Sequence, residues 1–139
     1  MESAMAETEY LRVVVSRRGK VRTAEFRLRE GESGLSMFLN RASPAPAQII
    51  EAVRAAGKQG DLAIAVIDTS HLAELGLRII RTPGGTTDAE VNAIHVEARL
   101  PWWRRIVLVL RGTSHHEYFN NKISSRLAEV ARLIGDEGA

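Results

Sequence analysis

Residues 61–67 read DLAIAVI, and from Leu62 onward every side chain in this stretch is apolar. Successive side chains of a strand point to opposite faces of the sheet, so an unbroken apolar run implies that both faces are covered. Gly60 precedes the run and Asp68 follows it, which limits it to the length of one strand. The stretch therefore predicts a central strand, buried on both sides, around which the rest of the fold is arranged.

Alternating patterns on both sides of this stretch predict further strands. Near the N-terminus, two alternating segments are joined by Arg18 and Gly19, which predicts a β-hairpin. Its apolar members are Leu11, Val13, Val15, Ala24, Phe26 and Leu28. Residues 35–39 fit either a short strand or the start of a helical turn, and residues 77–82 fit a strand that ends at Pro83.

Two segments have the spacing of amphipathic helices. Pro46 lies at the start of the first and Gly57 just after its end, which predicts a helix near 46–56. The second begins with Ser114 and Glu117, a capping-box pair, and ends at Gly135. Its apolar residues repeat every three or four positions, as expected for a long C-terminal helix that packs against a core: Phe119, Ile123, Leu127, Val130 and Ile134.

Residues 87–111 fit two descriptions. Thr87 and Glu90 form a possible capping box for a helix with Val91, Ile94, His95 and Ala98 on its apolar face. The segment 94–100 also alternates strictly, which is typical of a strand, and we favour the strand because the alternation is unbroken. After Pro101, the sequence of residues 102–111 fits either a strand or a helix.

These patterns predict an α+β fold. We expect a mixed, mostly antiparallel sheet of about five strands, with an N-terminal β-hairpin and a long C-terminal amphipathic helix packed on it. A chain of 139 residues has the size of one ordinary domain, so residues 10–139 are expected to form a single globular domain. Residues 1–9, which contain three glutamates, are expected to be a frayed or disordered start.

The composition excludes several classes of protein. The chain contains no cysteine, which rules out disulfide scaffolds, thiol nucleophiles, iron–sulfur clusters and thiolate zinc sites. No apolar run approaches the ~20 residues that a membrane helix needs, and the acidic start lacks the pattern of a secretory leader. We therefore expect a cytoplasmic protein that does not enter a membrane, with no cofactor and no metal site.

The basic residues are unevenly distributed. The chain has 19 basic and 17 acidic residues, yet between Tyr10 and Arg29 there are seven basic residues and a single acid, Glu25. Arg17 and Arg18 lie in this cluster, and a second one contains Arg99, Arg104, Arg105 and Arg111. Because guanidinium groups suit phosphate contacts, these clusters are candidate binding sites for nucleic acid or a nucleotide.

His95 and Glu97 form the first candidate catalytic pair. In a strand the two side chains share one face, where they could exchange a proton with a substrate, Glu97 orienting the histidine. Ser36 is a third candidate, as a serine that a histidine could activate, although the sequence does not show whether Ser36 lies near His95. The chain contains no phosphate-loop, nucleophile-elbow or zinc-protease motif.

Trp102 and Trp103, the two tryptophans of the chain, stand next to Arg104 and Arg105. Neighbours on a strand or helix point in different directions, so we expect at most one of these indoles deep in the core. An exposed tryptophan beside arginines could stack on a base or cover apolar surface at an interface.

The sequence thus favours a non-catalytic interaction module. It would be a subunit or accessory protein of a larger intracellular assembly and would bind a protein partner. Formation of homo-oligomers is compatible with this function. The alternative is a small nucleotide- or RNA-directed enzyme, of nuclease or ADP-ribosyl transfer type, that uses His95 and Glu97.

Overall fold

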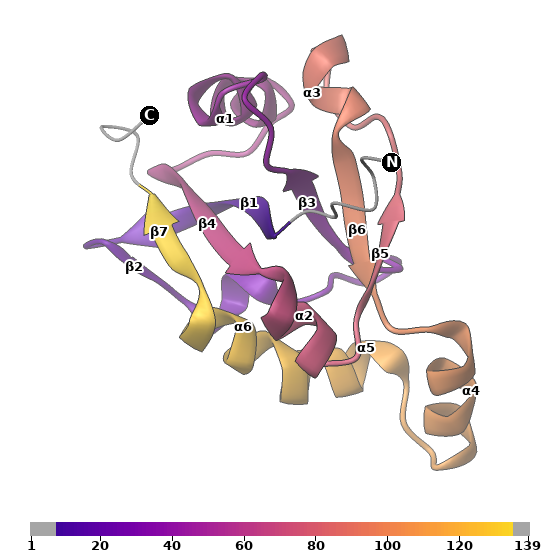
Figure 1. Cartoon of the computed structure of the whole chain (residues 1–139). Helices are drawn as coiled ribbons and strands as arrows, with labels where there is room; N and C mark the ends of the chain where they lie inside the picture. Colours follow the sequence, from indigo (N-terminus) through magenta and orange to yellow (C-terminus); the bar gives the residue numbers. More distant parts are fainter. Residues whose placement is uncertain (1–7, 135–139) are drawn as a thin grey trace.

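Seven antiparallel strands form the sheet of the computed structural model, which describes residues 8–134 (Figure 1). The strand order is β5-β6-β3-β1-β4-β7, and β2 pairs with β1. All pairings among the described residues are antiparallel. The strands are β1 (Glu9–Arg17), β2 (Lys20–Val21), β3 (Leu35–Leu39), β4 (Leu62–Asp68), β5 (Arg78–Arg81), β6 (His95–Arg99) and β7 (Arg132–Ile134).

Strand β4 is the predicted central strand. It pairs with β1 from Glu9↔Asp68 to Val15↔Leu62, and with β7 on its other edge. Residues 62–67 are all buried, as the apolar run predicts. Figure 1 shows why both faces are covered: α1 and α6 lie on opposite sides of the sheet.

Helices cover the sheet and connect its strands. The predicted helix near 46–56 is confirmed as α1. The α-helices are α1 (Pro46–Ala55), α2 (Thr69–Glu74), α3 (Ala89–Ala93), α4 (Trp102–Leu110), α5 (His115–Tyr118) and α6 (Ser124–Val130), to which the 3-10 helix η2 (Thr23–Phe26) and the π-helical turn η3 (Phe119–Ile123) are added. No helix within residues 8–134 is long and apolar enough to cross a membrane.

The prediction of about five strands was too low. Strands β2 and β7 contain two and three residues, which is too short for an alternating pattern to be recognised. The expected hairpin forms between β1 and β2, but the chain then turns into η2 instead of continuing as a strand. Phe26 in η2 is fully buried, and the Ser124 hydroxyl of α6 donates a hydrogen bond of 2.7 Å to its carbonyl oxygen. This packing against α6 fixes a helical turn where the alternation predicted a strand.

The C-terminal helix is shorter than expected and is interrupted. It runs from His115 to Val130 through α5, η3 and α6, with the Glu117 N–H donating to the Ser114 side chain at 3.1 Å as the capping pattern predicts. Ile134 belongs to β7, where it lies opposite Ile64 of β4. As a strand, residues 132–134 pair with the edge of β4, which they could not do as part of a longer helix. Gly135, the expected end of the helix, lies outside the described residues. Of the expected frayed start, residues 1–7 also lie outside the described residues, and Glu9 is part of β1.

The segment 87–111 contains a helix, a strand and a second helix. Helix α3 is capped by Asp88, not by Thr87, because the Asp88 carboxylate accepts the N–H groups of Glu90 and Val91. The favoured strand is confirmed as β6, and residues 102–110 are resolved as helix α4. Helix and strand patterns thus overlapped because the chain changes from one to the other at Ile94.

Candidate functional site

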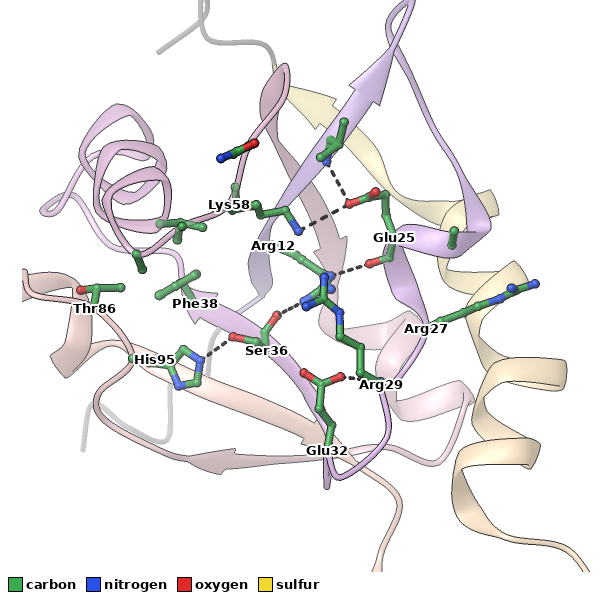
Figure 2. Close-up of a pocket in the computed structure, with 18 residues that line it drawn as sticks. Arg12, Glu25, Arg27, Arg29, Glu32, Ser36, Phe38, Lys58, Thr86 and His95 are labelled. Atoms are coloured by element: carbon green, nitrogen blue, oxygen red, sulfur yellow. Dashed lines mark hydrogen bonds and ion pairs between the residues drawn. The ribbon is translucent and has the colours of Figure 1, made fainter.

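A cavity opens where β1 loses its neighbouring strand. Strands β1 and β3 pair only at Tyr10↔Leu39 and Leu11↔Phe38, and β2 joins β1 from Ser16 onward. Between these pairings, residues 12–15 have a described strand neighbour only on the side of β4. The resulting cavity has a volume of about 660 Å³ and extends to α1 and to the loop before α3 (Figure 2).

Two charged side chains take the place of the missing strand. Glu25 accepts the N–H of Val15 at 2.9 Å. Arg12 donates to the carbonyl oxygens of Glu25, at 2.8 Å, and of Ser36, at 2.7 Å. Backbone groups that would otherwise be unpaired in the protein interior are satisfied in this way, and the gap between β1 and β3 stays open.

Arg12 places a positive charge at the base of the cavity. Its side chain is surrounded by protein, although part of its surface opens to the cavity. Burial lowers the pKa of the Arg12 guanidinium to about 10, against the attraction of Glu25 and Glu32. The group therefore stays charged at neutral pH, while its two hydrogen bonds go to neutral carbonyl groups.

Lys58, just after α1, brings a second positive charge to the same cavity. Its ammonium nitrogen lies 3.6 Å from Oε1 of Glu25. The pKa of Lys58 is lowered, first by burial and then by the nearby charge of Arg12. The attraction of Glu25 opposes this shift without cancelling it.

Ser36 and His95 meet on one face of the β3–β6 pair. Ser36 lies opposite Glu97, and Phe38 lies opposite His95, so Ser36 and His95 are diagonal neighbours. Their side chains approach to 2.5 Å between Oγ and Nε2. The Phe38 ring stands edge-on to the imidazole, with 5.3 Å between ring centroids, and limits how the histidine can turn.

Thr82 fixes the tautomer of His95. The Nδ1 atom lies 2.6 Å from the carbonyl oxygen of Thr82 and 2.9 Å from its hydroxyl. A carbonyl oxygen can only accept, so Nδ1 carries a proton, and in the neutral imidazole Nε2 then accepts the hydrogen bond from the Ser36 hydroxyl. The Thr82 N–H in turn donates to the His95 carbonyl at 3.1 Å, so the two residues are held together by backbone and side chain.

This geometry is that of a serine nucleophile with its base. A histidine that accepts from a serine hydroxyl, and whose other nitrogen is oriented by a third group, can remove the serine proton during attack on an electrophile. Figure 2 shows Ser36 between His95 on one side and Arg12 on the other. Negative charge that develops near Ser36 would therefore form close to a guanidinium.

The structure joins two of the three predicted catalytic residues. Ser36 and His95 are in contact, and both line the cavity. Glu97 shares their face of the sheet, but its carboxylate receives the Arg99 side chain at 2.8 Å, and Thr82 takes the position next to Nδ1 of His95. Sequence reasoning missed Thr82, which acts through its backbone carbonyl and so leaves no signal in the residue type.

Arg12 and Lys58 were also missed as site residues. Arg12 could have been found, because it is a charged residue within the apolar strand segment 11–15. Arg17 and Arg18, which the sequence selected from the same cluster, lie at the end of β1 and in the hairpin turn, exposed and away from the residues that line the cavity.

The tryptophans lie elsewhere, on α4. Trp102 and Trp103 are 67% and 53% exposed, so neither is in the core. Arg104 donates to the Tyr118 hydroxyl at 2.8 Å and lies over its ring, and Arg105 donates to the Ser33 carbonyl at 3.2 Å. The arginines thus hold α4 against the body of the protein while the indoles face outward.

Arg105 also contacts His115 at the start of α5. The distance from its Nη2 to Nδ1 of His115 is 3.1 Å. Burial, and then the charges of Arg105 and His116, lower the pKa of His115 to about 4, so this imidazole is neutral at physiological pH. Its position in the α4–α5 contact makes it a structural residue.

No family model, curated protein or solved structure matches this chain. Within residues 8–134, no group of three His, Asp or Glu side chains could hold a metal ion.

Proposed function

We propose that this protein is a small enzyme that transfers or hydrolyses an acyl group, with Ser36 as nucleophile and His95 as general base. The observation that carries the proposal is the 2.5 Å contact between Ser36 Oγ and His95 Nε2, together with the 2.6 Å contact that orients the other ring nitrogen toward Thr82. The pair lines a cavity large enough for a small organic substrate.

The proposed reaction has two steps, acylation of Ser36 and hydrolysis of the acyl-serine. The Ser36 oxygen forms a bond to the carbonyl carbon of an ester while its proton moves to Nε2 of His95. The leaving alkoxide departs with the electron pair of the broken C–O bond and takes that proton. Water, deprotonated by His95, then attacks the carbonyl carbon of the acyl-serine. The bond from this carbon to the Ser36 oxygen breaks, the Ser36 oxygen takes the proton from His95, and the carboxylic acid leaves.

A fluorophosphonate reagent tests whether Ser36 is a nucleophile. The serine oxygen would displace fluoride from phosphorus, so we expect the adduct mass on the peptide that contains Ser36, and p-nitrophenyl ester hydrolysis that the reagent abolishes. Ser36→Ala should lose both signals, whereas Ser125→Ala, at an exposed serine of α6, should keep them. Thermal melts would verify that both variants fold. Wild-type protein without an adduct at Ser36 would refute the proposal.

A second candidate function, protein recognition, is favoured by the exposed apolar face of α4. In Figure 1, α4 stands away from the sheet. Five of its large apolar side chains are at least half exposed: Trp102, Trp103, Ile106, Val109 and Leu110. No acidic residue lies between Glu97 and Glu117, whereas four arginines do. The face therefore suits an apolar groove bordered by carboxylates on a partner protein, since a second copy would bring like charges together.

The α4 proposal can be tested by placing a photo-crosslinking amino acid at Val109 in cells that produce the protein. We expect one acidic partner to be crosslinked and, once purified, to bind the wild-type chain. Trp103→Ala should raise the Kd for that partner about tenfold or more, as for an interface anchor. Lys122→Ala, at an exposed residue of η3, should leave Kd unchanged. Crosslinks between copies of this chain alone, or no crosslink, would contradict this candidate.

A further inference from the structure

The charges around the cavity are unbalanced. Its lining contains four cationic and two carboxylate side chains, a formal net charge of +2: Arg12, Arg27, Arg29 and Lys58 against Glu25 and Glu32. Three of the cations converge. Burial is the main cause of the lowered pKa of Arg12 and Lys58, and the charge of Arg29 adds to both shifts. In Figure 2 the Arg29 side chain is directed toward Arg12, whereas that of Arg27 points away from Arg12.

The two carboxylates are already engaged by the backbone. Glu25 accepts the Val15 N–H through Oε1, the same oxygen that lies 3.6 Å from Lys58. Glu32 accepts the N–H of Arg29 at 2.6 Å. Neither carboxylate forms a paired, two-bond contact with a guanidinium of the cavity, and the Arg12 guanidinium is bonded to carbonyl groups. The excess positive charge of the lining thus follows from its composition, four cations against two carboxylates, and Ser36 lines the same cavity.

Part of the cavity wall is apolar. It consists of short aliphatic side chains from β1, α1 and the C-cap of α1: Val13, Val15, Val53 and Ala56. A volume of about 660 Å³ far exceeds that of a single small anion and matches the range of sites for small organic molecules. The cavity thus offers both cationic and apolar side chains to the same ligand.

We infer that the cavity binds an organic phosphate, with its phosphate group held by Arg12, Arg29 and Lys58 and its organic part against the β1–α1 wall. A phosphate carries up to two charges and accepts the paired hydrogen bonds of a guanidinium, which suits three converging cations better than a single carboxylate would. The inference rests on the proposed function in one respect, that the bound molecule presents its reacting ester to Ser36. The phosphate site itself does not depend on the reactivity of Ser36.

Phenyl phosphate is a suitable probe, because it combines the two features that the cavity offers. Its binding to the full-length protein would be measured by isothermal titration calorimetry, with phenol and benzoate as ligands that lack the phosphate. We expect phenyl phosphate to bind more tightly than benzoate, and phenol to bind least. Lys58→Gln and Arg29→Gln should each raise Kd for phenyl phosphate about tenfold, by the loss of one charged contact.

Two controls separate this inference from the proposed function. Arg17→Gln, at the end of β1, should leave Kd unchanged because Arg17 is exposed and is not among the residues that line the cavity. Ser36→Ala should retain phenyl phosphate binding while losing the fluorophosphonate adduct. Binding without any adduct in the wild type would refute the nucleophilic serine and leave the phosphate site standing. An adduct at Ser36 without phenyl phosphate binding, or binding that survives both Lys58→Gln and Arg29→Gln, would overturn the phosphate site.

Discussion

His95→Gln is expected to slow the reaction of Ser36 with a fluorophosphonate by about 10²–10⁴-fold, the usual contribution of a general base. The glutamine amide can still hydrogen-bond to Ser36, but it cannot take up the proton. The backbone of β6, which pairs with β3 at Leu35–Phe38, would be unaffected. The measurement is the second-order rate constant for adduct formation, read from the intact mass over time.

Thr82→Val supplies the matched control for this variant. It removes the hydroxyl 2.9 Å from Nδ1 of His95 but retains the carbonyl at 2.6 Å. If that carbonyl orients the imidazole, Thr82→Val should react at close to the wild-type rate. A His95→Gln protein that reacts as fast as the wild type would show that Ser36 needs no base, and the proposed mechanism would then be wrong.

Phe26→Ala is expected to lower the free energy of unfolding by about 3–5 kcal/mol, the usual cost of removing a fully buried aromatic side chain. Phe26 has no exposed surface and belongs to η2, whose main packing partner is α6. The change would leave a cavity between η2 and α6 that the surrounding structure can fill only in part. Urea denaturation followed by circular dichroism measures the effect.

Phe26 also ties the core to the functional site. Its neighbour Glu25 accepts Arg12 through its carbonyl and Val15 through its carboxylate. Loosening η2 should therefore reduce phenyl phosphate binding as well as stability. Leu110→Ala, at a side chain that is 81% exposed, should change the free energy of unfolding by no more than about 0.5 kcal/mol. A Phe26→Ala protein as stable as the Leu110→Ala protein would contradict this account of the core.

Much of the fold could be predicted because burial leaves a periodic trace in the sequence. The apolar run at 62–67 predicted β4, Pro46 and Gly57 bounded α1, and the alternation around His95 predicted β6. Where the predictions were wrong, tertiary contacts outweighed the local pattern. The segment that contains Phe26 alternates like a strand, yet it forms a 3-10 helix because Phe26 packs against α6 and its carbonyl is held by Ser124.

The functional site, like the fold, could be predicted only in part from the sequence. The sequence by itself supplied Ser36, His95 and Glu97 as candidates, and it placed His95 and Glu97 on one face of a strand, because side-chain direction in a strand depends only on position along it. Only the tertiary structure brought Ser36 to His95, which is 59 residues away, since that contact depends on the β3–β6 register. Strand pairing likewise determines that Thr82, and not Glu97, orients His95. It also leaves the gap between β1 and β3 in which the charge of Arg12 is buried. Pairing between distant segments is a property of the folded chain, and no local pattern of residues records it.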